Sequence, residues 1–266
     1  MFRAFRNGTL FFFLAHVSAH GRIAQITTST GQVYEGWNAE SSDTLTPPHP
    51  LAAWSASNLG NIFVSPSQFS TPNITCHFNA VPGALDINVT AGDTLTLKWN
   101  EWPVSHVGPV MTHIAKCNET CATVNKNDLS WVKIDELGWL NSTGWEKMEL
   151  GGTWATDVLI ANNFSWVVQI PDVLAAGSYV LRHEIIALHV AEQLDGAQVY
   201  PQCVNLRVEQ GKSDQTKQLS DGVPGTKLYG ERDEGILVNI HGKISGYKTP
   251  GPKLWKEATP VQQPYQ

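Results

Sequence analysis

The sequence predicts an all-β protein, an immunoglobulin/fibronectin-like antiparallel β-sandwich with long loops. Several short segments alternate apolar and polar residues with the period of two that half-buried strands require, whereas no long segment keeps a helical period. The 15 prolines and 22 glycines are spread along the whole chain, which favours short strands and long loops. A β-sandwich that carries functional loops at its ends accounts for both observations.

The first 19 residues have the composition of a secretory signal peptide. Arg3 and Arg6 supply the positive start, residues 10–15 the apolar centre, and residues 17–19 (Val-Ser-Ala) a small-residue cleavage site. A buried N-terminal helix is the alternative, but three consecutive phenylalanines followed by a polar, turn-rich region leave it no amphipathic face. We therefore expect a secreted, extracellular protein whose mature chain begins at His20.

The strand pattern begins at residues 84–89, turns at 91–93 and resumes at 94–99, which predicts a β-hairpin. Further strands are expected at three segments that are bounded by Gly, Pro or Asp: residues 166–170, 178–188 and 204–208. The polar segment 211–226 is expected to be an exposed loop, and the apolar segment 235–240 to return to the core. One domain, residues 20–255, is expected, followed by a short tail at residues 256–266.

The charge balance limits the partners. There are 24 acidic residues against 18 Lys and Arg, which gives a net charge of −6, and no basic run occurs. Loss of Arg3 and Arg6 with the leader would lower the net charge to −8. Nucleic acid is therefore not an expected partner. No apolar stretch approaches the roughly 20 residues of a membrane span, so none is expected.

Four cysteines remain after the leader, an even number in an oxidising compartment: Cys76, Cys117, Cys121 and Cys203. Two disulfides are the simplest interpretation, although four cysteines allow three connectivities. Cys117 and Cys121 are four residues apart in a natural tight loop, which leaves Cys76 and Cys203 as the long-range pair. Acceptor triplets for N-glycosylation begin at Asn73, Asn88, Asn118, Asn141 and Asn163, which agrees with secretion.

A mature N-terminal histidine suggests a metal site, because its α-amine and its imidazole can close a chelate on one ion. The amine has a pKa of about 7.7–8.0, so it is available as a ligand near neutral pH. Two further segments carry imidazoles, residues 105–109 around His106 and residues 183–189. Nitrogen ligands without thiolate favour copper over zinc. His106 alone has an ordinary interpretation as a loop residue, and His183 and His189 are equally plausible as sheet residues.

Four blocks of sequence, in this order and spacing, resemble the fungal lytic polysaccharide monooxygenases of Auxiliary Activity family 9, formerly glycoside hydrolase family 61. They are His20-Gly21, residues 105–110 (SHVGPV) leading into 115–117 (AKC), residues 182–189 (RHEIIALH) and residues 196–203 (GAQVYPQC). Residues 233–240 (DEGILVNI) and 247–255 (YKTPGPKLW) are similar to the closing segment of the family. The resemblance therefore covers nearly all of the chain that follows the leader.

The resemblance implies a role for each matched residue. His20 would bind copper through its amine and ring, His106 would give the third nitrogen, and Tyr200 would lie at the axial position. His189 and Gln198 would hydrogen-bond the oxygen species and move protons. The sequence itself supports one pair, because Gln198 and Tyr200 are two apart and project from the same face of a strand. The disulfides would be Cys76–Cys203 and Cys117–Cys121.

The family's chemistry implies one copper ion per chain, O2 or H2O2 as co-substrate and an external electron donor. The expected substrate is cellulose or a related β-1,4-glucan, cleaved by oxidation at C1, C4 or both, and the protein is expected to be a monomer. Tyr247 lies where the family displays an aromatic ring for sugars. The chain departs from the family at Arg22, where many members have His, and over residues 27–70, which match poorly and leave the substrate preference open.

Other functions make different demands on the same residues. A non-catalytic, secreted polysaccharide-binding β-sandwich would not need His20, His106 or Tyr200. A copper carrier on the same scaffold would need His20 and His106 but neither His189 nor Gln198. A glycoside hydrolase would need a pair of carboxylates at a defined separation, and no motif here pairs acidic residues. The joint presence of these residues favours the monooxygenase.

Overall fold

The fold is built from two β-sheets packed face to face. The computed structural model describes residues 21–42, 49–57 and 62–265, and the expected leader and His20 lie outside this part. The four-stranded sheet has the order β10 (Ser165–Gln169), β4 (Thr94–Trp99), β1 (Ile23–Thr28), β2 (Val33–Glu35). The six-stranded sheet has the order β13 (Val223–Pro224), β6 (Ser130–Leu137), β5 (Val110–Lys116), β11 (Gly177–Ala187), β12 (Gln198–Glu209), β3 (Ile87–Thr90). This arrangement confirms the predicted β-sandwich.

The remaining elements are short. Two small sheets pair β14 (Gly242–Lys243) with β8 (Leu150–Gly151), and β7 (Trp139–Asn141) with β9 (Thr153–Trp154). The α-helices are α1 (Ala39–Ser42), α2 (Asn73–Cys76) and α3 (Ala155–Ala161); single 3-10 turns lie at Pro66–Gln68, Cys121–Thr123, Lys126–Asp128, Trp145–Lys147 and Gly225–Lys227. Within the described ranges no helix has the length and apolar character needed to cross a bilayer.

Alternation along the strands builds the core between the sheets. In β4, Leu95, Leu97 and Trp99 are fully buried and alternate with half-buried polar residues. The facing strand β11 contributes Leu181 and Ile185 to the same cluster. The segments predicted at 166–170, 178–188 and 204–208 are strands in β10, β11 and β12, which confirms them. β10 shows the period of two of a half-buried strand, whereas β11 is buried at every position from Ser178 to Ala187 because both faces of its sheet are covered.

The predicted hairpin over residues 84–99 is wrong. β3 pairs in parallel with β12, whereas β4 pairs antiparallel with β1 and β10, so the two segments belong to different sheets. At the turn between them the Gly92 amide donates to the carbonyl of Ile170, directly after β10, and the Ala91 amide to that of Glu209, at the end of β12. The turn predicted at residues 91–93 is present, but the chain crosses there from one sheet to the other.

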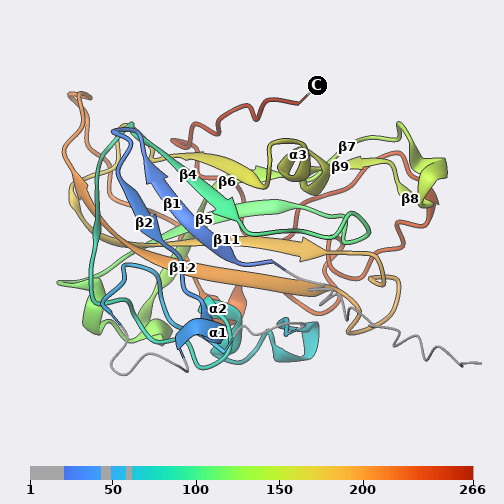
Figure 1. The fold of residues 1–266 in the computed structure, drawn as a ribbon, viewed down its shortest axis with the longest axis horizontal. Helices are drawn as coiled ribbons and strands as arrows, with labels where there is room; N and C mark the ends of the chain where they lie inside the picture. Colours follow the sequence, from blue (N-terminus) through green and yellow to red (C-terminus); the bar gives the residue numbers. More distant parts are fainter. Residues whose placement is uncertain (1–20, 43–48, 58–61, 266) are drawn as a thin grey trace, which may run out of the picture.

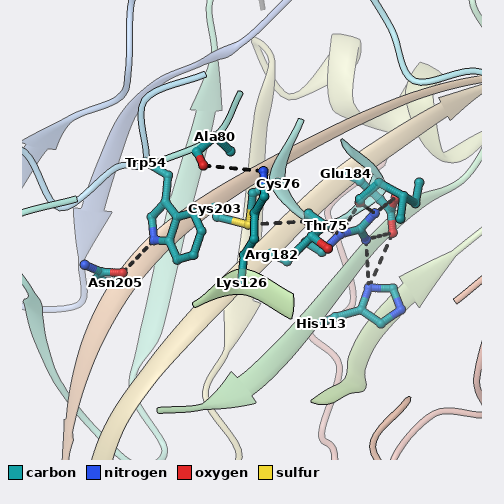
Figure 2. Close-up of a disulfide and its surroundings, with 11 residues drawn as sticks. Trp54, Thr75, Cys76, Ala80, His113, Lys126, Arg182, Glu184, Cys203 and Asn205 are labelled. Atoms are coloured by element: carbon teal, nitrogen blue, oxygen red, sulfur yellow. Dashed lines mark hydrogen bonds and ion pairs between the residues drawn. A yellow bond between two sulfur atoms is a disulfide. The ribbon is translucent and has the colours of Figure 1, made fainter. Parts of the chain in front are cut away.

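The outer face of the six-stranded sheet is also buried, under α2 and the segment that follows β13. Its cluster includes Ile186 of β11 and Ile236 and Ile240 of the covering segment, so residues 235–240 return to the core as predicted. A buried ion pair lies within it: Arg182 binds the Glu184 carboxylate and donates to the carbonyl of Thr75 in α2 (Figure 2). Its charged groups are therefore satisfied without water.

The two disulfides join Cys76 to Cys203 and Cys117 to Cys121, the pairing expected from the sequence. Cys76–Cys203 spans 127 residues and fastens α2 to β12 (Figure 2). A cross-link that closes a loop of this length stabilises the fold by about 4–5 kcal/mol when the loss of chain entropy in the unfolded state is counted. This anchor holds the outer covering against the strand that carries Tyr200.

Candidate metal centre

His106 lies in the loop between β4 and β5, at the end of the sandwich where β4 and β11 end and β12 begins (Figure 1). The His106 amide donates to the carbonyl of Pro103 at 3.0 Å, and the Trp102 indole Nε1 donates to the His106 carbonyl at 2.9 Å. Ser105 Oγ lies 3.1 Å from His106 Nδ1. These contacts fix the ring and direct its Nε2 away from the serine.

His189 lies just beyond the end of β11, in the loop that leads to β12. The Leu188 amide donates to the carbonyl of Val107 at 2.9 Å, which joins this loop to the loop of His106. The His106 and His189 ring centroids are consequently 4.0 Å apart. His183, the other candidate in this segment, is buried in β11 with Nδ1 2.9 Å from Thr112 Oγ1. The structure thus distinguishes the two candidates, which the sequence pattern did not: His189 lies beside His106, whereas His183 is buried in the sheet.

Gln198 and Tyr200 open β12 on the same side of the strand. The Tyr200 hydroxyl donates to Gln198 Oε1 at 2.7 Å, which confirms the shared face expected from their spacing. The Tyr200 ring packs edge-on against Trp102, with centroids 5.1 Å apart. Burial raises the pKa of Tyr200, so its phenol stays protonated at physiological pH. A neutral phenol is at most a weak ligand for a metal ion.

His20 lies outside the described residues, but the residues that follow it are held beside the His106 loop. The Arg22 amide donates to Asn100 Oδ1 at 2.7 Å, and the Asn100 amide to the carbonyl of Arg22 at 3.0 Å. Gly21 lies so close to Glu101 that a Cβ there would come within 1.9 Å of the Glu101 carbonyl oxygen. Glycine is required at this contact, one peptide bond from His20.

The donor chemistry of this end of the molecule fits a copper ion. Two imidazoles and a neutral phenol meet there, and all four cysteines are in disulfides, so thiolate is excluded. Nitrogen donors without thiolate suit copper. Within the described ranges, no group of three or more His, Cys, Asp or Glu is placed to hold a metal. A complete set of nitrogen ligands therefore depends on His20.

Tyr247 is fixed by its neighbours. Its hydroxyl donates to the carbonyl of Gly235 at 2.8 Å, and its ring packs edge-on against Trp154 with centroids 4.9 Å apart. The side chain is half-buried, so only part of the ring is available to a sugar. Burial raises the pKa of its hydroxyl.

The glycosylation candidates differ in exposure. Asn88, Asn118, Asn141 and Asn163 are exposed, whereas Asn73 is half-buried at the start of α2. The Asn73 amide nitrogen also donates to Gln68 Oε1 at 3.1 Å. These four residues therefore lie at the surface, where a glycan can be attached.

Trp102 was missed by the sequence reasoning. It contacts both His106 and Tyr200, with ring centroids 6.2 Å and 5.1 Å away, and thus joins the loop of His106 to strand β12. Ten tryptophans occur in the chain and most are core residues, so only its position four residues before His106 could have singled it out. Phe63, whose ring centroid is 6.1 Å from that of Tyr200, lies in the poorly matching segment and had no signal.

Comparison with known proteins identifies the family. The family model of Auxiliary Activity family 9 (formerly GH61) matches residues 20–248, and its first matched residue is His20. The chain belongs to Auxiliary Activity family 9. This family consists of copper-dependent lytic polysaccharide monooxygenases, so the resemblance, the oxidoreductase class and the copper dependence expected from the sequence are confirmed.

Several members of Auxiliary Activity family 9 resemble this chain over most of its length. Lytic polysaccharide monooxygenase A of Thermoascus aurantiacus is 46% identical over 89% of this chain and 99% of its own length. Monooxygenase A of Talaromyces verruculosus is 45% identical over 91% of this chain and 71% of its own length. The extended catalytic domain of H. jecorina LPMO9A superposes with a TM-score of 0.83 at 42% identity, covering 93% of this chain and 96% of that one.

Proposed function

We propose that this member of Auxiliary Activity family 9 is a secreted enzyme that cleaves cellulose or a related β-1,4-glucan by oxidation at C1, C4 or both. One observation carries the proposal: His106, His189, Gln198 and Tyr200, which span 95 positions of the chain, meet at one end of the sandwich. A non-catalytic binding module gains nothing from this convergence.

One copper ion per chain would be held by the amine and ring of His20 and by the ring of His106, with the Tyr200 phenol as a further, weak oxygen donor. Copper supplies one-electron redox chemistry that, with an external reductant and H2O2 or O2, oxidises a sugar C–H bond. Gly21, the first described residue, lies against Glu101, which is five positions before His106 in the sequence. This contact supports the role of His20, because it holds the start of the described chain beside the loop of His106.

The chain's own residues orient and protonate the site. Ser105 fixes the His106 ring through Nδ1, and the Trp102 indole fixes its backbone. Gln198 accepts from the Tyr200 hydroxyl, so its amide NH2 group is the part of the side chain that can donate toward the metal position. The imidazole of His189, beside His106, is placed to hold or deliver a proton there.

The substrate would lie across the exposed end of the sandwich, where a metal on the surface needs no pocket. The part of the Tyr247 ring that is left uncovered by Trp154 would contact a sugar face. The leader, the two disulfides and the exposed glycosylation triplets support secretion. We infer a monomer acting at the polysaccharide surface.

Product analysis tests the proposal. The mature, copper-loaded protein is incubated with swollen cellulose with and without ascorbate, and the soluble sugars are read by mass spectrometry, with the His106→Ala variant as the matched control. Ascorbate-dependent products carrying an aldonic acid, lactone or ketone mass are expected from the native chain only. Unoxidised sugars would indicate a hydrolase, and retention on cellulose without products would favour the binding module.

A further inference from the structure

A cavity of about 800 Å³ opens along the edge of the sandwich, on elements that do not contribute to the metal centre. Its floor consists of Asp135 in β6 and Trp166 in β10, and α3 contributes Val158. Residues 260–265 of the C-terminal segment form the opposite wall. The volume falls within the range of about 300–1,000 Å³ that holds small organic ligands.

The cavity contains a buried carboxylate without a cationic partner. Asp135 is only 2% exposed, and its Oδ2 accepts from Trp166 Nε1 at 2.7 Å. Burial raises the pKa of Asp135 to about 6, so the group is still ionised at neutral pH. None of the ion pairs formed by the described residues includes Asp135. A buried charge is normally compensated by a charge of opposite sign, and no described side chain supplies one to Asp135.

The other charged group in the wall is already neutralised. Glu136 accepts from Lys133 Nζ at 2.7 Å and from the Thr249 hydroxyl, and the same Nζ donates to the carbonyl of Pro250 at 2.7 Å. The Lys133 ammonium group therefore already binds Glu136 and the carbonyl of Pro250. No Lys or Arg is present among the described residues that line the cavity.

We propose that this cavity binds a small amphipathic cation, in which an amidinium, guanidinium or ammonium group pairs with Asp135 and an apolar body contacts the walls. The walls match such a body, because Leu137, Leu140, Val158 and Val261 surround the carboxylate. A metal ion is disfavoured, because no cluster of three or more metal-ligating side chains occurs in the described part of the chain. The site is separate from the copper chemistry.

The C-terminal segment that forms this wall is anchored to β10 through Gln263. Gln263 Oε1 accepts from the Val167 amide at 3.1 Å, and its Nε2 donates to the Val167 carbonyl at 2.7 Å. The side chain thus pairs like a short strand with the outer edge of β10, which is an edge strand of its sheet. Tyr265, which is half exposed, lines the cavity beyond this anchor and offers an aromatic face to a cation.

Benzamidinium and benzamide are matched probes for this site. They share shape and apolar body, but only benzamidinium is charged, and its protonated nitrogens do not coordinate copper. Calorimetric titration of the copper-loaded mature chain at pH 7 should show benzamidinium binding at least about tenfold more tightly than benzamide, because a charge-assisted pair replaces a neutral contact. Absence of benzamidinium binding, or equal affinity for both probes, overturns the proposal.

Asp135→Asn keeps an oxygen acceptor for Trp166 Nε1 and removes the charge. We expect this variant to lose the preference for benzamidinium, whereas Glu146→Gln, an exposed carboxylate outside the cavity, keeps it. An unchanged preference in Asp135→Asn overturns the proposal. If that variant does not fold, the native chain is titrated with both probes at pH 7 and at pH 5. Protonation of Asp135 should abolish the preference for benzamidinium at pH 5. The same preference at both pH values overturns the proposal.

Discussion

At the scale of single residues, the metal centre depends on how His106 is held. Its backbone is fixed by Pro103 and Trp102 and its ring by Ser105, so Nε2 has one direction. His106→Ala removes one of three expected nitrogen ligands, and we expect copper affinity to fall by about 3 kcal/mol or more, over 100-fold. Competition titration against a copper chelator measures this.

The matched control for His106→Ala is His49→Ala, an exposed histidine paired with Glu35. This variant should bind copper as the native chain does. Equal copper affinity in native protein and His106→Ala would remove His106 from the site.

Gln198 acts on the site without being a ligand. Gln198→Ala frees the Tyr200 hydroxyl of its acceptor and removes the amide NH2 group. We expect copper to remain bound while the rate of formation of oxidised products falls about 10- to 100-fold. Gln198→Glu, which keeps an acceptor for Tyr200, separates the contribution of that hydrogen bond from the contribution of the NH2 group. Native turnover in Gln198→Ala would contradict the assigned role.

Residue patterns in the sequence predicted part of this site and missed the rest. Gln198 and Tyr200 share a strand face, so their proximity follows from local geometry. The choice of His189 over His183 required the family resemblance, because both positions fit an extended segment. Trp102 lies four residues before His106, but its contact with Tyr200 arises only when this loop packs against strand β12.

At the scale of elements, the buried pair of Arg182 and Glu184 fastens the outer covering to β11. Glu184 also accepts from the Tyr229 hydroxyl in the covering segment. Glu184→Gln leaves the guanidinium buried without its counter-charge, and we expect the free energy of unfolding to fall by about 3–5 kcal/mol. Urea unfolding with the disulfides intact measures the change.

The control for Glu184→Gln is Glu234→Gln, which breaks an exposed pair with Lys248. Its effect should stay below about 1 kcal/mol, because solvent screens surface pairs. Equal effects of the two substitutions would show that burial of the ion pair has no energetic consequence.

Strand identity was more predictable than strand pairing. The Gly, Pro and Asp residues that bound them located β10, β11 and β12, although β11 is buried on both faces and β10 on one. Alternation over residues 84–99 suggested a hairpin, yet the turn at Gly92 sends β3 and β4 into opposite sheets. The sequence pattern of residues 84–99 does not show that the turn binds the distant carbonyls of Glu209 and Ile170, and these two hydrogen bonds fix the crossing.

At the scale of the whole molecule, three buried histidines make stability depend on pH. Burial lowers the pKa of His77 to about 4, of His183 to about 3, and of His113 well below its usual value. The unfolded chain, with histidine pKa values near 6.5, binds these protons first as the pH falls. The stabilising contribution of the neutral rings is therefore complete above pH 6.5 and is lost at lower pH.

Asp135 has the opposite effect on the stability of the fold over the same pH range. Burial raises its pKa to about 6, so the folded chain takes up one proton before the unfolded chain does. Three histidine protons against one carboxyl proton leave a net loss of stability on the order of 2 kcal/mol per pH unit between pH 6 and pH 5. Urea unfolding at both pH values checks this slope, and an increase in stability on acidification would contradict it.

In the proposed copper site, the free N-terminal amine of His20 completes the set of nitrogen ligands. The most direct measurement compares copper affinity in two chains that both begin at His20, one with a free α-amine and one whose α-amine is acetylated and therefore no longer available as an amine ligand. We predict one tightly bound copper in the first chain and at least about 100-fold weaker binding in the second, with loss of oxidised products. Equal copper affinity in the two chains would contradict the account.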